Sequence, residues 1–161
     1  MKKDWKLILI LAIIIVILIT FKKPIKKLMS RGYNNNNPGN IRKTSDLWQG
    51  EVEGTDQDFK TFESMSFGYR AIVVLLNSYF NKRGLNNVQD IISTYAPGNE
   101  NNTEAYIKAV CQRTGFDRDQ VLDFNDPDTI KSLMAAISYV ENGISADNDE
   151  IESGYNLYYN G

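Results

Sequence analysis

The stretch DPDTIKSLMAAISYVENG, residues 126–143, carries the clearest structural signal in this sequence. Asp126 followed by Pro127 is a favourable start for a helix, because the Asp side chain caps it and Pro fits its first turn. Apolar residues then recur at helical spacing, at Ile130, Leu133, Met134, Ile137 and Val140. Asn142 and Gly143 end the pattern. The stretch predicts a long amphipathic helix that closes on a carboxylate, Glu141.

The segments around this helix predict a mainly α fold with a small β-hairpin. The same spacing predicts helices at 66–83, 88–96 and 104–115. The stretch WQGEVEGTDQDFKTF, residues 48–62, predicts the hairpin, with Val52 and Phe59 flanking its turn. Residues 146–161 are polar and aromatic, and their periodicity is too weak to assign them to an element, so they are interpreted as a C-terminal tail.

The N-terminal region predicts a single transmembrane helix. Residues 7–21, LILILAIIIVILITF, are apolar except for Thr20. Trp5 and the flanking lysines extend this run to a predicted anchor at 5–23, close to the roughly 20 residues that a bilayer requires. A cleavable signal peptide is the alternative, but the residues that follow contain no small-x-small cleavage site. Residues 24–31 then form a short basic stalk.

Composition restricts the chemistry of the remaining domain. After position 31 the chain holds ten basic and 19 acidic residues, a formal charge of −9, which disfavours nucleic acid as a partner. The chain has no His and a single cysteine, Cys111, so zinc sites and His-based triads are not expected. We predict no metal and no cofactor, and chemistry based on carboxylates, hydroxyls and amides.

Glu141 is the strongest candidate for such chemistry. Cleavage of a glycosidic bond requires a carboxylic acid that stays protonated, which burial beside apolar groups favours. The negative end of the helix dipole also disfavours ionisation of a carboxylate in the last turn. The structural alternative is that Glu141 is an ordinary solvated residue at a helix end. The Asn-rich loop at 34–42 can bind sugar hydroxyl and acetamido groups, or can simply be a polar turn.

Five ordered motifs resemble a family of phage virion-associated proteins described as lysozyme-like or transglycosylase-like. They are NNNNPGNIR (34–42), WQG (48–50), FKTFESMSFGYRA (59–71), YAPGNENNTEAYIKAV (95–110) and AAISYVENG (135–143). The resemblance covers about residues 32–143 and implies a lysozyme-like catalytic domain at 32–145. It implies a helical fold in which the hairpin forms one lip of a groove, with the glycan strands of peptidoglycan as substrate.

A more distant similarity to flagellar-type β-N-acetylglucosaminidases implies which residue is catalytic. In that family a helix ends in a catalytic Glu, and an Asn-containing stretch, a W-x-G motif and a hairpin follow. The same pieces are circularly permuted in this sequence, which is tolerated where termini lie close together. The similarity implies that Glu141 is the general acid and lies beside Asn36, Asn37 and Asn40.

The resemblance leaves the second step of the reaction open. In a hydrolase a second carboxylate activates water or attacks carbon, and the candidates are Glu51, Glu53 and Asp58. In a lytic transglycosylase Glu141 alone would serve. The substrate-binding candidates are those three asparagines together with Trp48, Tyr95 and Glu100. Glu100 could equally stabilise the start of the next helix.

These expectations describe a phage-encoded, single-pass membrane enzyme that degrades the cell wall, in a viral inner membrane or in the host inner membrane. Because five basic residues follow the apolar run and three precede it, the positive-inside rule places the domain in the cytoplasm. Peptidoglycan lies on the other side of a host membrane, so a virion membrane or an exception to the rule is required. One alternative is a non-catalytic glycan-binding or structural virion membrane protein, and another is a late lysis protein.

Overall fold

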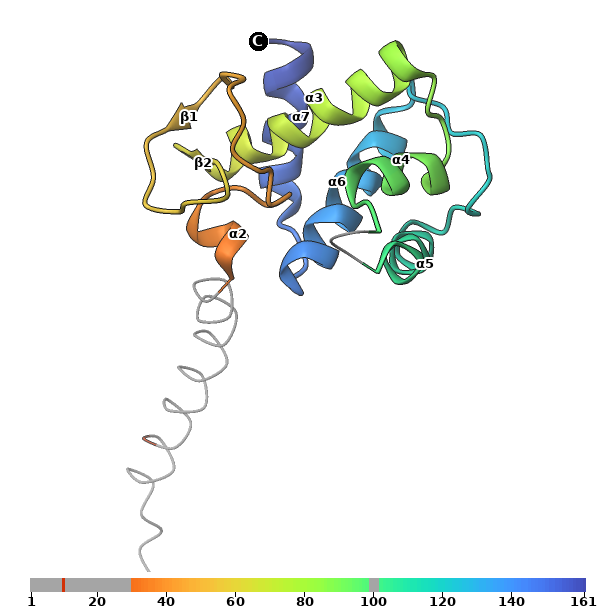
Figure 1. The fold of residues 1–161 in the computed structure, drawn as a ribbon, viewed down its shortest axis with the longest axis horizontal. Coiled ribbons are helices and arrows are strands. Elements are labelled where there is room, and N and C mark those ends of the chain that lie inside the picture. The colour runs from red at the N-terminus through yellow and green to blue at the C-terminus, as the bar shows by residue number, and fades with distance from the viewer. Residues whose placement is uncertain (1–9, 11–29, 99–101) are drawn as a thin grey trace, which may run out of the picture.

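The computed structural model describes Ile10, residues 30–98 and residues 102–161, and shows a mainly helical domain with one small sheet (Figure 1). This confirms the predicted mainly α class and the hairpin. The elements are α2 (Arg31–Asn34), β1 (Glu51–Val52), β2 (Thr61–Phe62), α3 (Met65–Arg83), α4 (Val88–Tyr95), α5 (Thr103–Thr114), α6 (Pro127–Asn142) and α7 (Asn148–Tyr159).

The helix boundaries follow the local signals in the sequence. The side chain of Asn87 accepts a hydrogen bond from the Asp90 amide and caps α4. Asp126 caps α6 in the same way, and Gly143 ends that helix with a φ of 64°, a left-handed conformation that glycine adopts without strain. Each predicted helix is therefore confirmed to within one or two residues.

The hairpin is shorter than its sequence suggests. Its two-residue strands are antiparallel, and Glu51 pairs with Phe62. Phe59, expected to flank the turn, instead forms a bridge with Arg42 outside the hairpin. The physical reason is a side chain: Asp56 accepts hydrogen bonds from the amides of Asp58 and Phe59 and bends the chain before the second strand begins.

The C-terminal segment interpreted as a polar tail contains helix α7, which packs extensively against α3 (Figure 1). Gly154 makes this close contact possible, since a Cβ there would lie 2.4 Å from the Cβ of Tyr69. The buried face of α7 includes only Ile151 and Gly154, so it gives little hydrophobic signal in the sequence.

The core has two parts. The larger cluster lies mainly among α3 to α6, extends to α2 and α7, and includes Tyr69, Leu76, Ile92, Val110 and Leu133. The smaller one consists of Ile41, Phe62 and Ala71, with Trp48, Phe67 and Leu75 packed against it. Because the second cluster covers the hairpin side of α3, the hairpin and the loop before it form a separate wall beside the helices.

Among the described residues, no helix combines the length and the hydropathy needed to cross a bilayer. The predicted anchor at 5–23 lies outside the described residues except for Ile10, as does the stalk at 24–31 except for Ser30 and Arg31.

Candidate functional site

The carboxyl group of Glu141 receives hydrogen bonds from two distant segments. Asn40 donates its Nδ2 to Oε2 at 2.9 Å, and the Tyr106 hydroxyl donates to Oε1 at 2.8 Å. Asn40 belongs to the Asn-rich loop, Tyr106 to α5 and Glu141 to the last turn of α6. The tertiary structure thus brings three parts of the chain to one carboxyl group.

Burial shifts the protonation equilibrium of this group. It raises the pKa of Glu141 above its ordinary value of 4.5, although the hydrogen bonds from Asn40 and Tyr106 act in the opposite direction. Burial likewise raises the pKa of the Tyr95 and Tyr106 phenols, so both remain neutral hydrogen-bond donors. The protonated form of Glu141 is therefore more accessible near neutral pH than that of an ordinary glutamate.

The two hydrogen-bond partners of Glu141 differ in whether they can accept a hydrogen bond as well as donate one. The amide nitrogen of Asn40 can only donate, whereas the hydroxyl of Tyr106 can donate to a carboxylate or accept from a carboxylic acid. Tyr106 can consequently remain bonded to Glu141 in both protonation states, and Asn40 orients the other oxygen. This arrangement suits a group that holds a proton and then releases it.

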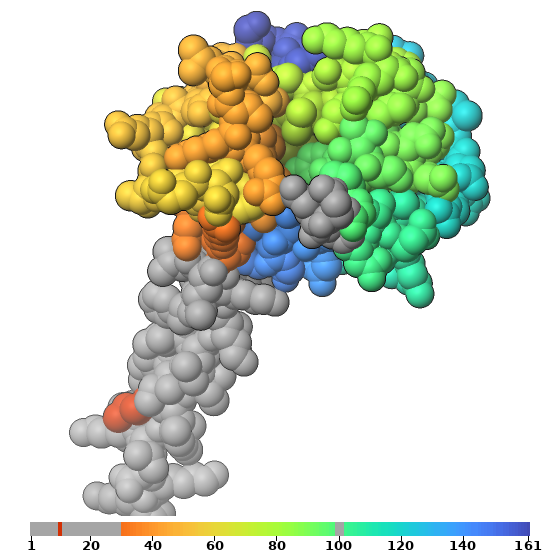
Figure 2. Space-filling model, viewed as in Figure 1, coloured from red at the N-terminus to blue at the C-terminus, as the bar shows by residue number. Residues whose placement is uncertain are grey.

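Glu141 lies on the wall of a cleft of about 390 Å³. In the space-filling view, residues 31–62 lie on one side of the domain and α3 to α5 on the other (Figure 2). The cleft draws its walls from both, with a mixture of aromatic, polar and charged side chains. Its lining residues are Gly39, Asn40, Ile41, Arg42, Thr44, Asp46, Trp48, Phe59, Leu75, Tyr79, Tyr95, Ala96, Pro97 and Glu141.

Asn36 and Asn37 have structural roles in the loop, and the structure does not place them on the cleft wall. Asn37 is fully buried, donates to the carbonyls of Ile41 and Lys60 at 2.9 Å each, and accepts from the Ile41 amide. Asn36 donates to the Phe62 carbonyl at 2.9 Å. Their side-chain amides bond backbone groups of the loop and hairpin, and of the three predicted asparagines only Asn40 lines the cleft with Glu141.

The predicted aromatic residues do line the cleft. The hydroxyl of Tyr95 donates to the Gly39 carbonyl, which ties α4 to the Asn-rich loop. The indole nitrogen of Trp48 is buried and has no hydrogen-bond partner among the residues that the structure describes. Glu100, the remaining substrate-binding candidate, lies outside the described residues.

None of the three predicted second carboxylates lines the cleft with Glu141. Glu51 pairs with the buried Lys60 at 2.9 Å, and Asp58 pairs with Arg31 at 2.7 Å. Glu53 is exposed on the hairpin. The structure therefore does not bring these carboxylates to the cleft wall beside Glu141, because Lys60 and Arg31 bind two of them and the third faces solvent.

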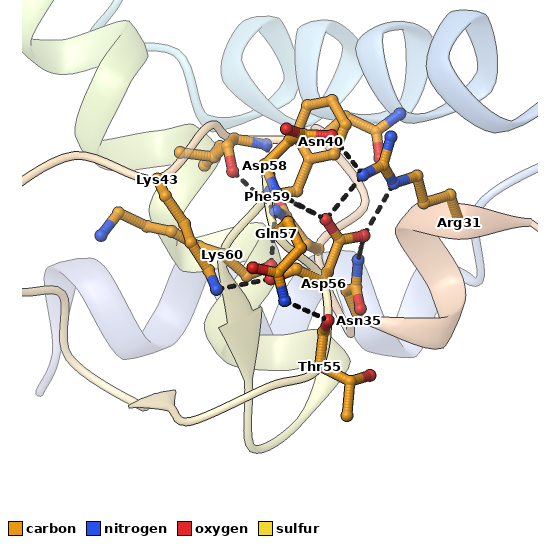
Figure 3. Close-up of polar contacts among 12 residues, drawn as sticks. Arg31, Asn35, Asn40, Lys43, Thr55, Asp56, Gln57, Asp58, Phe59 and Lys60 are labelled. Atoms are coloured by element: carbon orange, nitrogen blue, oxygen red, sulfur yellow. Dashed lines mark hydrogen bonds and ion pairs between the residues drawn. The ribbon is translucent and has the colours of Figure 1, made fainter.

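A network centred on Asp56 holds the hairpin loop to the start of the domain (Figure 3). Arg31 donates two hydrogen bonds to the Asp56 carboxylate at 2.7 Å, and Asn35 donates a third at 2.7 Å. These donors, Arg31 foremost, hold the pKa of Asp56 well below its ordinary value. The guanidinium of Arg31 also lies 4.3 Å from the centre of the Phe59 ring. These hydrogen bonds therefore fix the hairpin loop next to the cleft wall that Phe59 forms.

Sequence reasoning missed two residues of the site, Tyr106 as a partner of Glu141 and Asp46 on the cleft wall. Tyr106 lies on the apolar face of the helix predicted at 104–115, and its ring is buried there. Only its hydroxyl reaches Glu141. Asp46 stands two residues before Trp48 in an irregular loop, where no periodicity gives a signal.

We expect the stability of the protein to depend on pH through Glu141. The carboxyl group of Glu141 has a higher pKa in the folded protein than in the unfolded chain, so the unfolded chain releases this proton at a lower pH. The folded protein therefore loses stability as the pH rises through the raised pKa. Glu141→Gln removes the titration, so its stability relative to the unmodified chain should increase from acidic to neutral pH. Denaturant unfolding between about pH 3 and about pH 8 would measure this. A constant difference across the range would contradict it.

Comparison with known proteins gives the family of the chain. No protein-family model matches the sequence. Protein P5 of Pseudoalteromonas phage PM2 is 40% identical over 131 residues, which cover 78% of this chain and 80% of the relative. The chain belongs to the family of protein P5. Membership in the protein P5 family supports the bacteriophage setting that the sequence predicts. The name of this relative specifies no activity.

Proposed function

We propose that this chain is a peptidoglycan-cleaving glycosidase, a muramidase or a lytic transglycosylase, with a lysozyme-like domain. The observation that carries the proposal is the environment of Glu141. Its carboxyl group is largely buried on the wall of a cleft, is oriented by Asn40 and Tyr106, and has a raised pKa. A general acid that protonates a leaving oxygen needs these properties.

In the first step the protonated Glu141 donates its proton to the glycosidic oxygen as the bond to the anomeric carbon breaks. The aromatic rings of Trp48 and Tyr95 provide surfaces on which sugar rings stack. In a hydrolase, water adds to the anomeric carbon, and a carboxylate takes the proton that this water loses. In a lytic transglycosylase, the 6-hydroxyl of the muramic acid adds instead, and Glu141 takes up its proton.

The proposed enzyme is phage-encoded and held in a membrane by residues 5–23. This membrane is either the inner membrane of the virion or that of the host. In both settings the domain acts on the cell wall, during penetration or lysis. The apolar run at 7–21 and the basic residues beside it support the anchor.

The test uses the full chain in detergent, incubated with purified sacculi, with the released material analysed by mass spectrometry. We expect soluble muropeptides, and their ends report which bond is cut and whether the product is anhydro or reducing. If the chain sediments with sacculi and releases nothing, the proposal fails. The alternative of a non-catalytic glycan-binding or structural virion membrane protein is then supported.

A further inference from the structure

A second carboxylate, that of Asp46, contributes to the same cleft wall as Glu141. Asp46 lies in the loop before the hairpin, whereas Glu141 lies in the last turn of α6. The two carboxyl groups therefore come from segments far apart in the sequence. The described lining residues include no other Asp or Glu. This pairing matters because the mechanism of a glycosidase depends on whether a second carboxylate faces the bond.

The loop that carries Asp46 is fixed from inside by a buried lysine. Lys60 is 1% exposed, and its ammonium group donates to the Asp46 carbonyl at 2.8 Å and contacts the Thr44 carbonyl at 3.4 Å. Both Glu51 oxygens lie 2.9 Å from the same nitrogen. An ammonium group removed from water requires such partners, so the backbone at Asp46 is held in place.

The Asp46 side chain itself is exposed and only lightly engaged. Its Oδ2 accepts a hydrogen bond from the Thr44 hydroxyl at 3.3 Å. Its Oδ1 has no hydrogen-bond partner within residues 30–98 and 102–161. A carboxylate on a fixed backbone, with one oxygen open to water, can accept a proton from a water molecule in the cleft.

We propose that Asp46 is the general base of a hydrolytic reaction and makes hydrolysis the main outcome. This inference rests on the proposed function. The oxygen of a water molecule forms a bond to the anomeric carbon, and Asp46 takes the proton that this water loses. The bond from the anomeric carbon to the glycosidic oxygen breaks, and Glu141 supplies the proton that the leaving oxygen gains. Glu51 and Asp58 cannot substitute for Asp46, because Lys60 and Arg31 respectively hold their carboxylates.

The test compares the products that the full chain and two variants release from sacculi. Asp46→Asn removes the base, and Asp58→Asn is the matched control, a nearby exposed carboxylate that does not line the cleft. We expect the unmodified chain to release reducing-end muropeptides. Asp46→Asn should lower their rate of formation by about 100-fold or more, in the range typical for loss of a general base. Asp58→Asn should retain the original rate.

A second measurement separates a base from a merely structural residue. Asp46→Ala is assayed with added azide, which can attack the anomeric carbon without a base. We expect azide to restore cleavage and to give a glycosyl azide, with no such product from Glu141→Gln. Unchanged reducing-end products from Asp46→Asn would overturn the inference. Exclusively anhydro products from the unmodified chain would also overturn it and leave the proposed function intact. Absence of any release would overturn the proposed function itself.

Discussion

Replacement of Glu141 by glutamine is expected to lower the rate of muropeptide release by about 100- to 10,000-fold, the usual contribution of a general acid. Glutamine has nearly the same shape, and its oxygen can still accept a hydrogen bond from Asn40 or Tyr106. Its amide is not acidic enough to transfer a proton to the leaving oxygen. The fold should therefore persist while the protonation step is lost, and release from sacculi measured over time would show the difference.

The matched control is Glu53→Gln, which removes a carboxylate of the same size from the exposed face of the hairpin. It should release muropeptides at the original rate. The circular dichroism spectra of both variants should match that of the unmodified chain. If Glu141→Gln retained full activity, the role of the α6 carboxyl as proton donor would be refuted, whatever the activity of the other variants.

Lys60→Met is expected to lower the free energy of unfolding by about 3 kcal/mol, the lower end of the range for breaking a buried ion pair. The methionine stem replaces the buried methylene groups, but the Glu51 carboxylate loses its cation. The Asp46 carbonyl loses its donor as well. The lower end applies because the Glu51 side chain is 22% exposed, so water can partly solvate the remaining charge. Denaturant unfolding of the full chain in detergent measures the change.

Two further variants make this prediction specific to the buried pair. Lys43→Met removes an exposed lysine from the same loop region. Its ammonium group donates to the Asp56 carbonyl, where water can replace it, so we expect a smaller loss of stability, about 1 kcal/mol or less. Adding Glu51→Gln to Lys60→Met should recover part of the lost stability, since no unpaired charge then remains. If the Lys60 and Lys43 variants lost equal amounts of stability, the buried ammonium group would stabilise the fold no more than an exposed one.

The helices could be predicted because their signals are local. The Asn87 and Asp126 caps, the Gly143 stop and the apolar stripe of 130–140 act through neighbours within one or two turns. Helix α7 could not be recognised in this way. Its contact with α3 depends on the absence of a side chain at Gly154, and a missing side chain adds nothing to a hydrophobic pattern.

The candidate site was predicted only in part. The resemblance implied that Glu141 lies beside the Asn-rich loop, and the hydrogen bond from Asn40 agrees with it. It did not indicate which asparagine makes the contact, because Asn36, Asn37 and Asn40 have the same chemistry. The hydrogen bonds of Asn37 with Ile41 and Lys60 depend on the path of the folded loop.

By itself, the sequence determined the helical class, the boundaries of α3 to α6 and the short list of carboxylates from which a proton donor could come. These follow from composition and from interactions between residues close together in the chain. Only the tertiary structure decided that Tyr106 and Asn40 form hydrogen bonds with Glu141 and that Lys60 forms an ion pair with Glu51. It also decided that Asp46 lines the same cleft as Glu141. The reason is that burial and hydrogen bonding between residues far apart in sequence arise only when the segments pack.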